Sequence, residues 1–186
     1  MKAKLFLLIL TVSIIFTGCH KDDPIPKDPD PQMTVLVYML ANNNLASYAK
    51  GNIKDIISVS QTKNINYGNM IVFKAGLTEN PQLVQIKEND LGEVEEVVVK
   101  EYEADNTADP DLLNEVIGDV KQKFPTSNYG LVLWSHGTSW LPSNYKQVKA
   151  FGQDGSNWIE IDELAKGIPD NVFHFIMFDA CYMVNT

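Results

Sequence analysis

Four runs of apolar and β-branched residues constrain the fold of this chain more than any other feature. They occupy residues 34–40 (TVLVYML), 70–76 (MIVFKAG), 129–135 (YGLVLWS) and 172–179 (VFHFIMFD). Strands that are apolar at successive positions, rather than at alternate ones, are buried on both faces, as in parallel sheets. The runs therefore predict the central strands of a mostly parallel sheet.

The segments between these runs predict flanking helices and one hairpin. Asn42-Asn43-Asn44 ends the first run and offers an N-cap, and Asp109-Pro110-Asp111 places acids and proline where helices begin. The expected helices span 45–59, 109–124 and 160–166, and the expected hairpin strands span 83–86 and 94–99. Alternation of strands and helices indicates an α/β fold with right-handed crossovers, and the length suits one domain.

The first 18 residues predict a secretory signal peptide. Lys2 and Lys4 precede an apolar stretch at 5–16. That stretch gives about 18 Å of helix, too short for a hydrocarbon core of about 30 Å. Phe16-Thr17-Gly18-Cys19 resembles a bacterial lipobox, which predicts lipid on Cys19 and an exported lipoprotein of the outer membrane or cell surface. An ordinary signal peptide with an incidental cysteine is the alternative.

Residues 19–33 predict an extended linker behind the lipid-carrying cysteine. Four prolines fall between residues 24 and 31, and proline-rich segments form semi-rigid spacers. The folded domain is therefore expected to span 34–186. The chain has two cysteines, so assigning Cys19 to lipid leaves Cys181 as a free thiol.

The charge of the chain excludes one class of partner. It has 24 acidic and 15 basic residues, the basic ones are all lysines, and the net charge is −9. Nucleic-acid binding needs basic patches that neutralise phosphates, so we expect no nucleic-acid partner. The acidic stretch 88–115 predicts a solvated face. We expect no cofactor; calcium at this stretch is an alternative, without an Asp-x-Asp-x-Asp-Gly loop to support it.

Two chemically reactive residues follow two of the predicted strands. His136 comes directly after the run 129–135, and Cys181 comes two residues after the run 172–179. Ligands bind beyond the carboxyl ends of parallel strands, and a nearby imidazole promotes the thiolate form of a cysteine. The pattern predicts a His–Cys pair with an oxyanion hole made by the N–H groups of Gly137 and Cys181. A buried cysteine and a strand-end histidine without function fit the same spacing.

Two further residues are weaker candidates. Ser135 could act as a serine nucleophile, but the chain lacks the Gly-x-Ser-x-Gly elbow of α/β-hydrolases. His174 lies inside an apolar run, which favours a packed core side chain over a catalytic one.

Three ordered motifs resemble the clostripain family of cysteine peptidases, which groups with gingipains and caspases. They are TVLVYM with Asn43-Asn44-Leu45, Leu133-Trp134-Ser135-His136-Gly137 with Trp140, and Phe178-Asp179-Ala180-Cys181-Tyr182-Met183. The resemblance implies a caspase-like fold, a catalytic dyad of His136 and Cys181, and cleavage of protein or peptide substrates after Lys or Arg. It also places Asp179 near the specificity pocket, where a carboxylate would suit a cationic side chain.

The resemblance further implies self-cleavage between the histidine and the cysteine. The loop 144–152 offers Lys146 and Lys149. We expect the cut at Lys149-Ala150 because the glycine-containing segment 152–155 behind it should be flexible. Lys146 is the second choice, and an uncut solvated loop is the alternative.

Two departures from the family pattern bear on these expectations. The family usually has aspartate where this chain has Asn42, and the family domain continues beyond the position of Thr186 with strands and helices that complete its sheet. We therefore expect the run 172–179 to leave an open edge and exposed apolar surface. In this interpretation the chain is a fragment, a truncated gene product or half of a complex. A catalytically inactive surface lipoprotein is the competing hypothesis.

Overall fold

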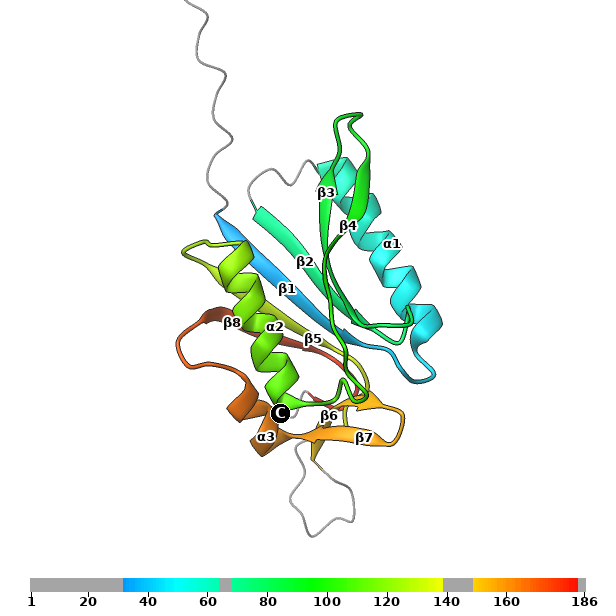
Figure 1. Cartoon of the computed structure of the whole chain (residues 1–186), viewed down its shortest axis with the longest axis vertical. Coiled ribbons are helices and arrows are strands. Elements are labelled where there is room, and N and C mark those ends of the chain that lie inside the picture. Colours follow the sequence, from blue (N-terminus) through cyan, green and yellow to red (C-terminus); the bar gives the residue numbers. More distant parts are fainter. Residues whose placement is uncertain (1–31, 64–67, 139–148, 184–186) are drawn as a thin grey trace, which may run out of the picture.

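The computed structural model describes residues 32–63, 68–138 and 149–183 (Figure 1). The predicted signal peptide, Cys19 and all but the last two residues of the predicted linker lie outside these ranges, so processing and lipidation stay predictions. None of the helices within the described ranges is long and apolar enough to span a membrane.

The centre of the domain is a six-stranded sheet with the order β4-β3-β2-β1-β5-β8. Parallel pairing joins β1 to β2 and to β5, and joins β5 to β8, whereas β2, β3 and β4 are antiparallel neighbours. The strands are β1 (Met33–Leu40), β2 (Gly68–Ala75), β3 (Gln82–Glu88), β4 (Val94–Glu101), β5 (Tyr129–Trp134) and β8 (Phe173–Asp179). The predicted α/β sheet with a hairpin is confirmed.

Strand β1 packs against a layer of side chains on each face. Tyr38 belongs to the core layer that contains α2 (Pro110–Lys123), whereas Met39 belongs to the layer that contains α1 (Ala46–Lys63). Successive residues of a strand point to opposite faces. An unbroken apolar run therefore fills both layers, and Figure 1 shows α1 and α2 on either side of the sheet.

The second and third helices begin close to where the sequence predicts. Asp109 caps α2: its Oδ1 accepts hydrogen bonds from the N–H groups of Asp111 (2.8 Å) and Leu112 (2.9 Å). Pro110 occupies the first turn, where a missing N–H costs nothing. Helix α3 (Ile161–Gly167) is the predicted short helix, shifted by one residue.

A second, two-stranded sheet lies where the sequence predicts a flexible segment. β6 (Ala150–Asp154) pairs antiparallel with β7 (Asn157–Glu160). Gly152 has a φ of +75°, and a Cβ on it would lie 2.7 Å from Cδ1 of Leu40 at the end of β1. The expectation that 152–155 is flexible is wrong because its glycines serve close packing and a left-handed backbone.

Strand β8 forms one edge of the sheet. Phe175, Ile176 and Met177 are 40%, 45% and 49% exposed, which confirms the expected open edge. His174 is exposed as well, so the expectation of a packed core histidine is wrong. The reason is that β8 has a neighbouring strand on one side only within the part of the chain that the structure describes.

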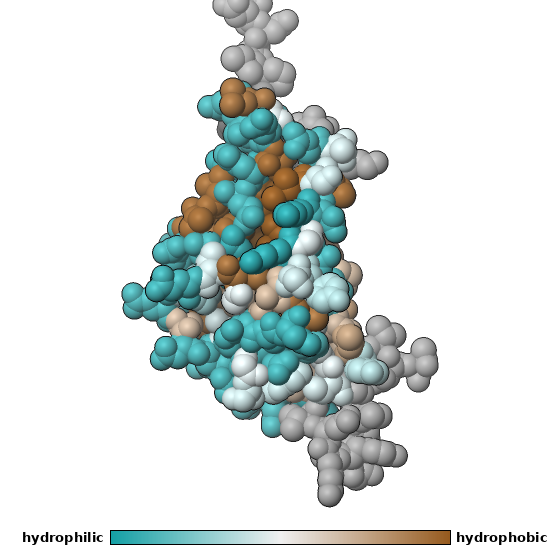
Figure 2. Space-filling model, turned by 90° about the vertical axis from the view of Figure 1, so that its right-hand side faces the viewer, coloured by the Kyte–Doolittle hydropathy of each residue, from teal (hydrophilic) through white to brown (hydrophobic). Residues whose placement is uncertain are grey.

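The opposite edge of the sheet, strand β4, carries part of the acidic stretch 88–115. Figure 2 looks at the side formed by α1 and β4 and shows apolar side chains gathered among polar ones. Glu95 and Glu101 of β4 are exposed, as a solvated face requires. Val98, between these two acids, and Leu91, in the turn before β4, are exposed as well.

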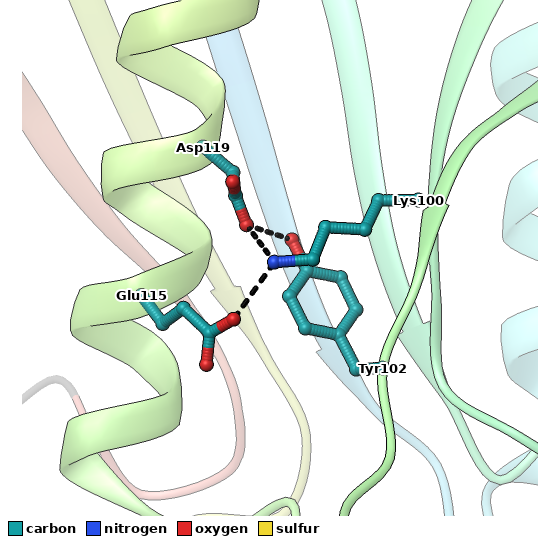
Figure 3. A network of polar contacts seen from close by, with 4 residues as sticks. All are labelled: Lys100, Tyr102, Glu115 and Asp119. Atoms are coloured by element: carbon teal, nitrogen blue, oxygen red, sulfur yellow. Dashed lines mark hydrogen bonds and ion pairs between the residues drawn. The ribbon is translucent and has the colours of Figure 1, made fainter.

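One polar network ties β4 to α2 (Figure 3). The Lys100 ammonium lies 2.7 Å from Oε1 of Glu115 and 2.7 Å from Oδ2 of Asp119, and the Tyr102 hydroxyl donates to the same Asp119 oxygen (2.8 Å). The hydrogen bond to Asp119, followed by that to Glu115, raises the pKa of Lys100. Burial, followed by the Asp119 hydrogen bond, raises the pKa of Tyr102.

Replacing Lys100 by methionine should lower the free energy of unfolding near neutral pH by about 1 kcal/mol, because Glu115 and Asp119 lose their shared cation. Lys100 has a raised pKa in the folded state. Its contribution to the free energy of unfolding is therefore complete below about pH 10, and it is lost as the pH rises through that raised pKa. Urea denaturation near neutral pH and at about pH 11 measures both effects. The exposed Lys54→Met variant is the control, and equal stability of the two variants near neutral pH would contradict the prediction.

Candidate active site

The two predicted catalytic residues follow neighbouring strands at the same edge of the sheet. β5 ends at Trp134 and β8 at Asp179, and these two residues are partners in the parallel register. His136 and Cys181 each lie two residues further along the chain. Both line one cavity of about 480 Å³. The other residues that line this cavity are Asn43, Asn44, Gly137, Gln153, Gly155, Trp158 and Tyr182.

Hydrogen bonds made by its own carbonyl and by the side-chain hydroxyl of the neighbouring Ser135 hold His136 in place. The buried Ser135 hydroxyl donates to the Leu40 carbonyl (2.8 Å) and accepts from the N–H of Gln153 (3.1 Å). The carbonyl of His136 accepts from the N–H of Gly152 (2.9 Å). These contacts join the ends of β1, β5 and β6 directly behind the imidazole. Ser135 therefore has a structural role, and its hydroxyl is not presented to the cavity.

The imidazole has a polar partner that the sequence reasoning missed. Nε2 of His136 lies 2.6 Å from Oδ1 of Asn44. An amide oxygen can only accept, so a neutral imidazole in this contact carries its proton on Nε2 and leaves Nδ1 with a lone pair. The sequence motif included Asn44 without a role. In a sequence, two neighbouring asparagines after a strand indicate a helix cap, and they give little indication of a hydrogen bond to a distant imidazole.

Asn43 supports the same segment from the other side. Its Oδ1 accepts from the N–H of Leu45 (2.8 Å), and its Nδ2 donates to the carbonyl of Gln153 (2.8 Å). Asn43 thus forms a turn ahead of α1 rather than the predicted N-cap, because the carbonyl of Leu45 accepts the first helical hydrogen bond, from Ala49. The same side chain fastens the segment to β6.

Trp158 is a second residue of the site that the sequence analysis did not assign. Its ring centroid lies 6.5 Å from that of His136, at an angle of 44°. Trp158 belongs to β7, and no β7 was predicted. A second cavity of about 650 Å³ shares Gly137, Trp158 and Tyr182 with the first and extends to Glu160, so the two hollows are continuous.

The glycine after the histidine lies tightly against the cysteine segment. A Cβ on Gly137 would lie 2.7 Å from the carbonyl oxygen of Cys181 and 2.8 Å from Cγ of Met183. Gly137 forms an isolated antiparallel bridge with Phe151, but its flanking residues make the hydrogen bonds: Thr138 donates to Ala150, and His136 accepts from Gly152. Among the described residues, the N–H of Gly137 has no acceptor.

The cysteine lies in a turn with a left-handed residue. Cys181 is a free, exposed thiol, and the next residue, Tyr182, has a φ of +59°. A large side chain rarely adopts this conformation, and such positions cluster at functional sites. The turn brings the buried Met183 back under Gly137.

Asp179 is not brought into this cavity. It is the last residue of β8 and its side chain is exposed. It lines neither of the two hollows next to His136. Its assignment to a specificity pocket stays a prediction.

The expected self-cleavage bond lies in ordered backbone. Ala150 is 1% exposed at the start of β6. Its N–H donates to Oγ1 of Thr138 (2.9 Å), and the carbonyl of Lys149 accepts from the N–H of Ile161 (3.0 Å). Cleavage of Lys149-Ala150 would require these contacts to open first. The second choice, Lys146, lies outside the described residues.

The described residues offer no obvious metal centre. Within 32–63, 68–138 and 149–183, no group of three or more His, Cys, Asp or Glu side chains could hold a metal ion. The calcium alternative stays untested.

Comparisons with known proteins agree with the geometry. A profile of the clostripain family (peptidases C11) matches residues 37–186. A secreted C11 cysteine protease from Bacteroides thetaiotaomicron, solved with an irreversible peptide inhibitor, is 32% identical with a TM-score of 0.70; the match covers 82% of this chain and 43% of that one. An inactive zymogen C11 protease from Parabacteroides distasonis is 35% identical with a TM-score of 0.70, over 83% and 43%.

A third solved relative is shorter. A cysteine protease chain from B. fragilis is 32% identical with a TM-score of 0.56, and the match covers 62% of this chain and 98% of that one. This chain therefore spans less than half the length of the first two relatives and exceeds the third. No curated protein matches it.

Gly137→Ala should destabilise the domain by about 1–3 kcal/mol, because its new Cβ can be accommodated only if the Cys181 backbone moves. Gly118→Ala is a matched control: Gly118 lies inside α2 with nothing within 4 Å of an added Cβ, so that variant should gain about 0.5–1 kcal/mol. Urea denaturation compares the two. A Gly137→Ala domain as stable as wild type would contradict the described packing of the cysteine turn.

Proposed function

Because the chain belongs to the clostripain family of cysteine peptidases, we propose that it hydrolyses peptide bonds with Cys181 as nucleophile and His136 as general base. The observation that carries this proposal is the shared cavity. A thiol and an imidazole from adjacent strand ends line it together, and the imidazole has an amide partner on its far nitrogen. Shared lining by a thiol and an imidazole with an orienting amide supports a nucleophile–base pair.

In the proposed reaction, Nδ1 of His136 accepts the proton of the Cys181 thiol, and the thiolate attacks the substrate carbonyl. The Gly137 and Cys181 N–H groups donate to the resulting oxyanion. The imidazolium then protonates the departing amine, and the C–N bond breaks to leave a thioester on Cys181. Water, deprotonated by His136, hydrolyses the thioester and regenerates the thiol. Asn44 keeps the imidazole in the tautomer and orientation that these steps need.

The proposed substrates are proteins or peptides with Lys or Arg at the cleaved position. The net charge of −9 supports this choice, since an acidic enzyme attracts cationic peptides. Asp179 is the proposed carboxylate for the cationic side chain. A peptide inhibitor occupies the B. thetaiotaomicron relative, which supports peptides as the substrate class.

The proposed location is outside the cytoplasm, on a membrane. The B. thetaiotaomicron relative is described as secreted, which supports export. Lipid on Cys19 would add a membrane anchor through the linker 19–33.

A second candidate function is binding without catalysis. The exposed apolar edge strand β8 favours it, because apolar side chains at 40–49% exposure mark a surface that normally contacts protein. Under this alternative the chain is an inactive surface lipoprotein. The two candidates differ in one observable, the hydrolysis of a peptide amide.

Wild-type protein should hydrolyse peptide amides with Lys or Arg before the scissile bond. Cys181→Ala and His136→Ala should each lower kcat/KM by about a thousandfold or more. Asn44→Ala should lower kcat by about tenfold or more with little change in KM, because only the orientation of the base is lost. Equal rates in wild type and Cys181→Ala would refute the dyad. The absence of hydrolysis in all forms would favour the binding alternative.

We also propose self-processing between His136 and Cys181, with Lys149-Ala150 as the first choice of bond and Lys146 as the second. The inactive zymogen state of the P. distasonis relative and the short B. fragilis chain support a processed form. Incubation followed by intact-mass measurement should give two fragments in wild type and none in Cys181→Ala. Lys149→Gln should remove the cut or move it to Lys146. A wild-type chain that stays intact would contradict self-processing.

A further inference from the structure

Asp154 is a buried carboxylate that the proposed mechanism does not use. It ends β6 and is 4% exposed. No lysine within the described ranges forms an ion pair with it. Burying a carboxylate is unfavourable unless hydrogen-bond donors replace its water, so the surroundings of Asp154 must supply them.

Two residues from distant parts of the chain donate to this carboxylate. The N–H and the hydroxyl of the buried Thr107 donate to Oδ2, at 2.6 and 2.7 Å, and Nδ2 of Asn42 donates to Oδ1. The carbonyl of Thr107 in turn accepts from the Tyr38 hydroxyl (3.1 Å). Asp154 thereby joins β6, the segment before α2 and the end of β1.

The carboxylate lies directly behind two walls of the cavity. Asn43 and Asn44 line one wall, and Gln153 and Gly155, on either side of Asp154, line the other. Three contacts join the segments: Asn42 to Asp154, Gly155 N–H to the Asn42 carbonyl (2.9 Å), and Asn43 to the Gln153 carbonyl. Asn44 then reaches His136.

We propose that Asp154 is a positioning residue, whose carboxylate holds the segment 42–44 through the Asn42 amide and so keeps Asn44 against His136. The inference rests on the proposed function, since His136 is the base that it orients. Asp154 touches neither substrate nor the reacting atoms. Its effect passes through Asn42 and the backbone to Asn44.

The contact needs a hydrogen-bond donor on one side chain and an acceptor on the other, which the Asn42 amide and the Asp154 carboxylate supply. Aspartate at position 42 would put two carboxylates in contact, and like charges at such a distance cannot both ionise without cost. A shared proton would restore the contact at low pH, and the contact would fail as the pH rises and the pair loses that proton. Asn42 is itself exposed, so this exchange leaves the packing of the core unchanged.

Exchanging both residues should restore the contact. In the double variant Asn42→Asp with Asp154→Asn, the new amide can present its oxygen to the two Thr107 donors and its NH₂ to the carboxylate at position 42. With the side chains oriented as in wild type, Asn42→Asp alone places acceptor against acceptor, and Asp154→Asn alone places donor against donor. Rescue by the exchange would distinguish an interaction from two unrelated losses.

The test is the rate at which iodoacetamide alkylates Cys181 in the full, unprocessed chain, followed by peptide mapping. Cys19 in the same molecule serves as the internal reference. His136→Ala should slow alkylation of Cys181, because the imidazole promotes its thiolate. Asn42→Asp should slow the alkylation of Cys181 by about fivefold or more at pH 8. At pH 5 the rate of this variant should lie closer to that of wild type. The double variant should return to within about twofold of wild type at both pH values.

The outcomes separate the two ideas. If His136→Ala alkylates like wild type, the dyad fails and the positioning role fails with it. If His136→Ala is slow but Asn42→Asp is as fast as wild type, the dyad stands and the positioning role is overturned. A double variant as slow as Asn42→Asp would also overturn it. Far-UV circular dichroism checks folding. If Asn42→Asp does not fold, the double variant alone tests the positioning role. A wild-type alkylation rate in the double variant then supports the contact, and a slow rate or an unfolded chain overturns it.

Discussion

The parallel pairing of β5 with β1 and with β8 is the constraint on which the site depends. It places three carboxyl ends at one edge of the sheet, with Trp134 and Asp179 in register. His136 and Cys181 line the same cavity because each follows its strand by two residues. A shift of one residue in the β5–β8 register would turn every side chain of one strand to the other face, and the pair would no longer share a cavity.

Residues with no part in bond breaking hold this edge together. Ser135 ties β5 to β1 and β6, Gly137 admits the cysteine turn, and Asp154 fastens the segment 42–44 to the β6–β7 hairpin. Together they join the segments that carry His136, Asn44 and Cys181. A base and oxyanion donors that are already in place stabilise the transition state more than additional reactive groups would, because they need no rearrangement when charge develops.

The sequence predicts the sheet, and the sheet edge at which His136 and Cys181 lie, because both depend on local pattern. Unbroken apolar runs identify strands buried on both faces, and strand ends locate the pair. The β6–β7 hairpin was missed because Gly152 and Gly155 are typical of loops, and the packing role of Gly152 depends on Leu40, which is more than a hundred residues away. Asn44 and Asp154 were missed for the same reason: their partners, His136, Thr107 and Asn42, are distant in the sequence. His174 was misplaced because an apolar run gives no sign of whether its strand is central or at an edge.

The central claim is that Cys181 is a nucleophile activated by His136. Its most direct measurement is mass spectrometry of the full chain after reaction with a lysyl peptide that carries an electrophilic ketone. We expect one adduct, on Cys181, that forms in wild type and is strongly reduced in His136→Ala. An adduct distributed equally between Cys19 and Cys181, or one on Cys181 that forms as fast without the imidazole, would contradict it.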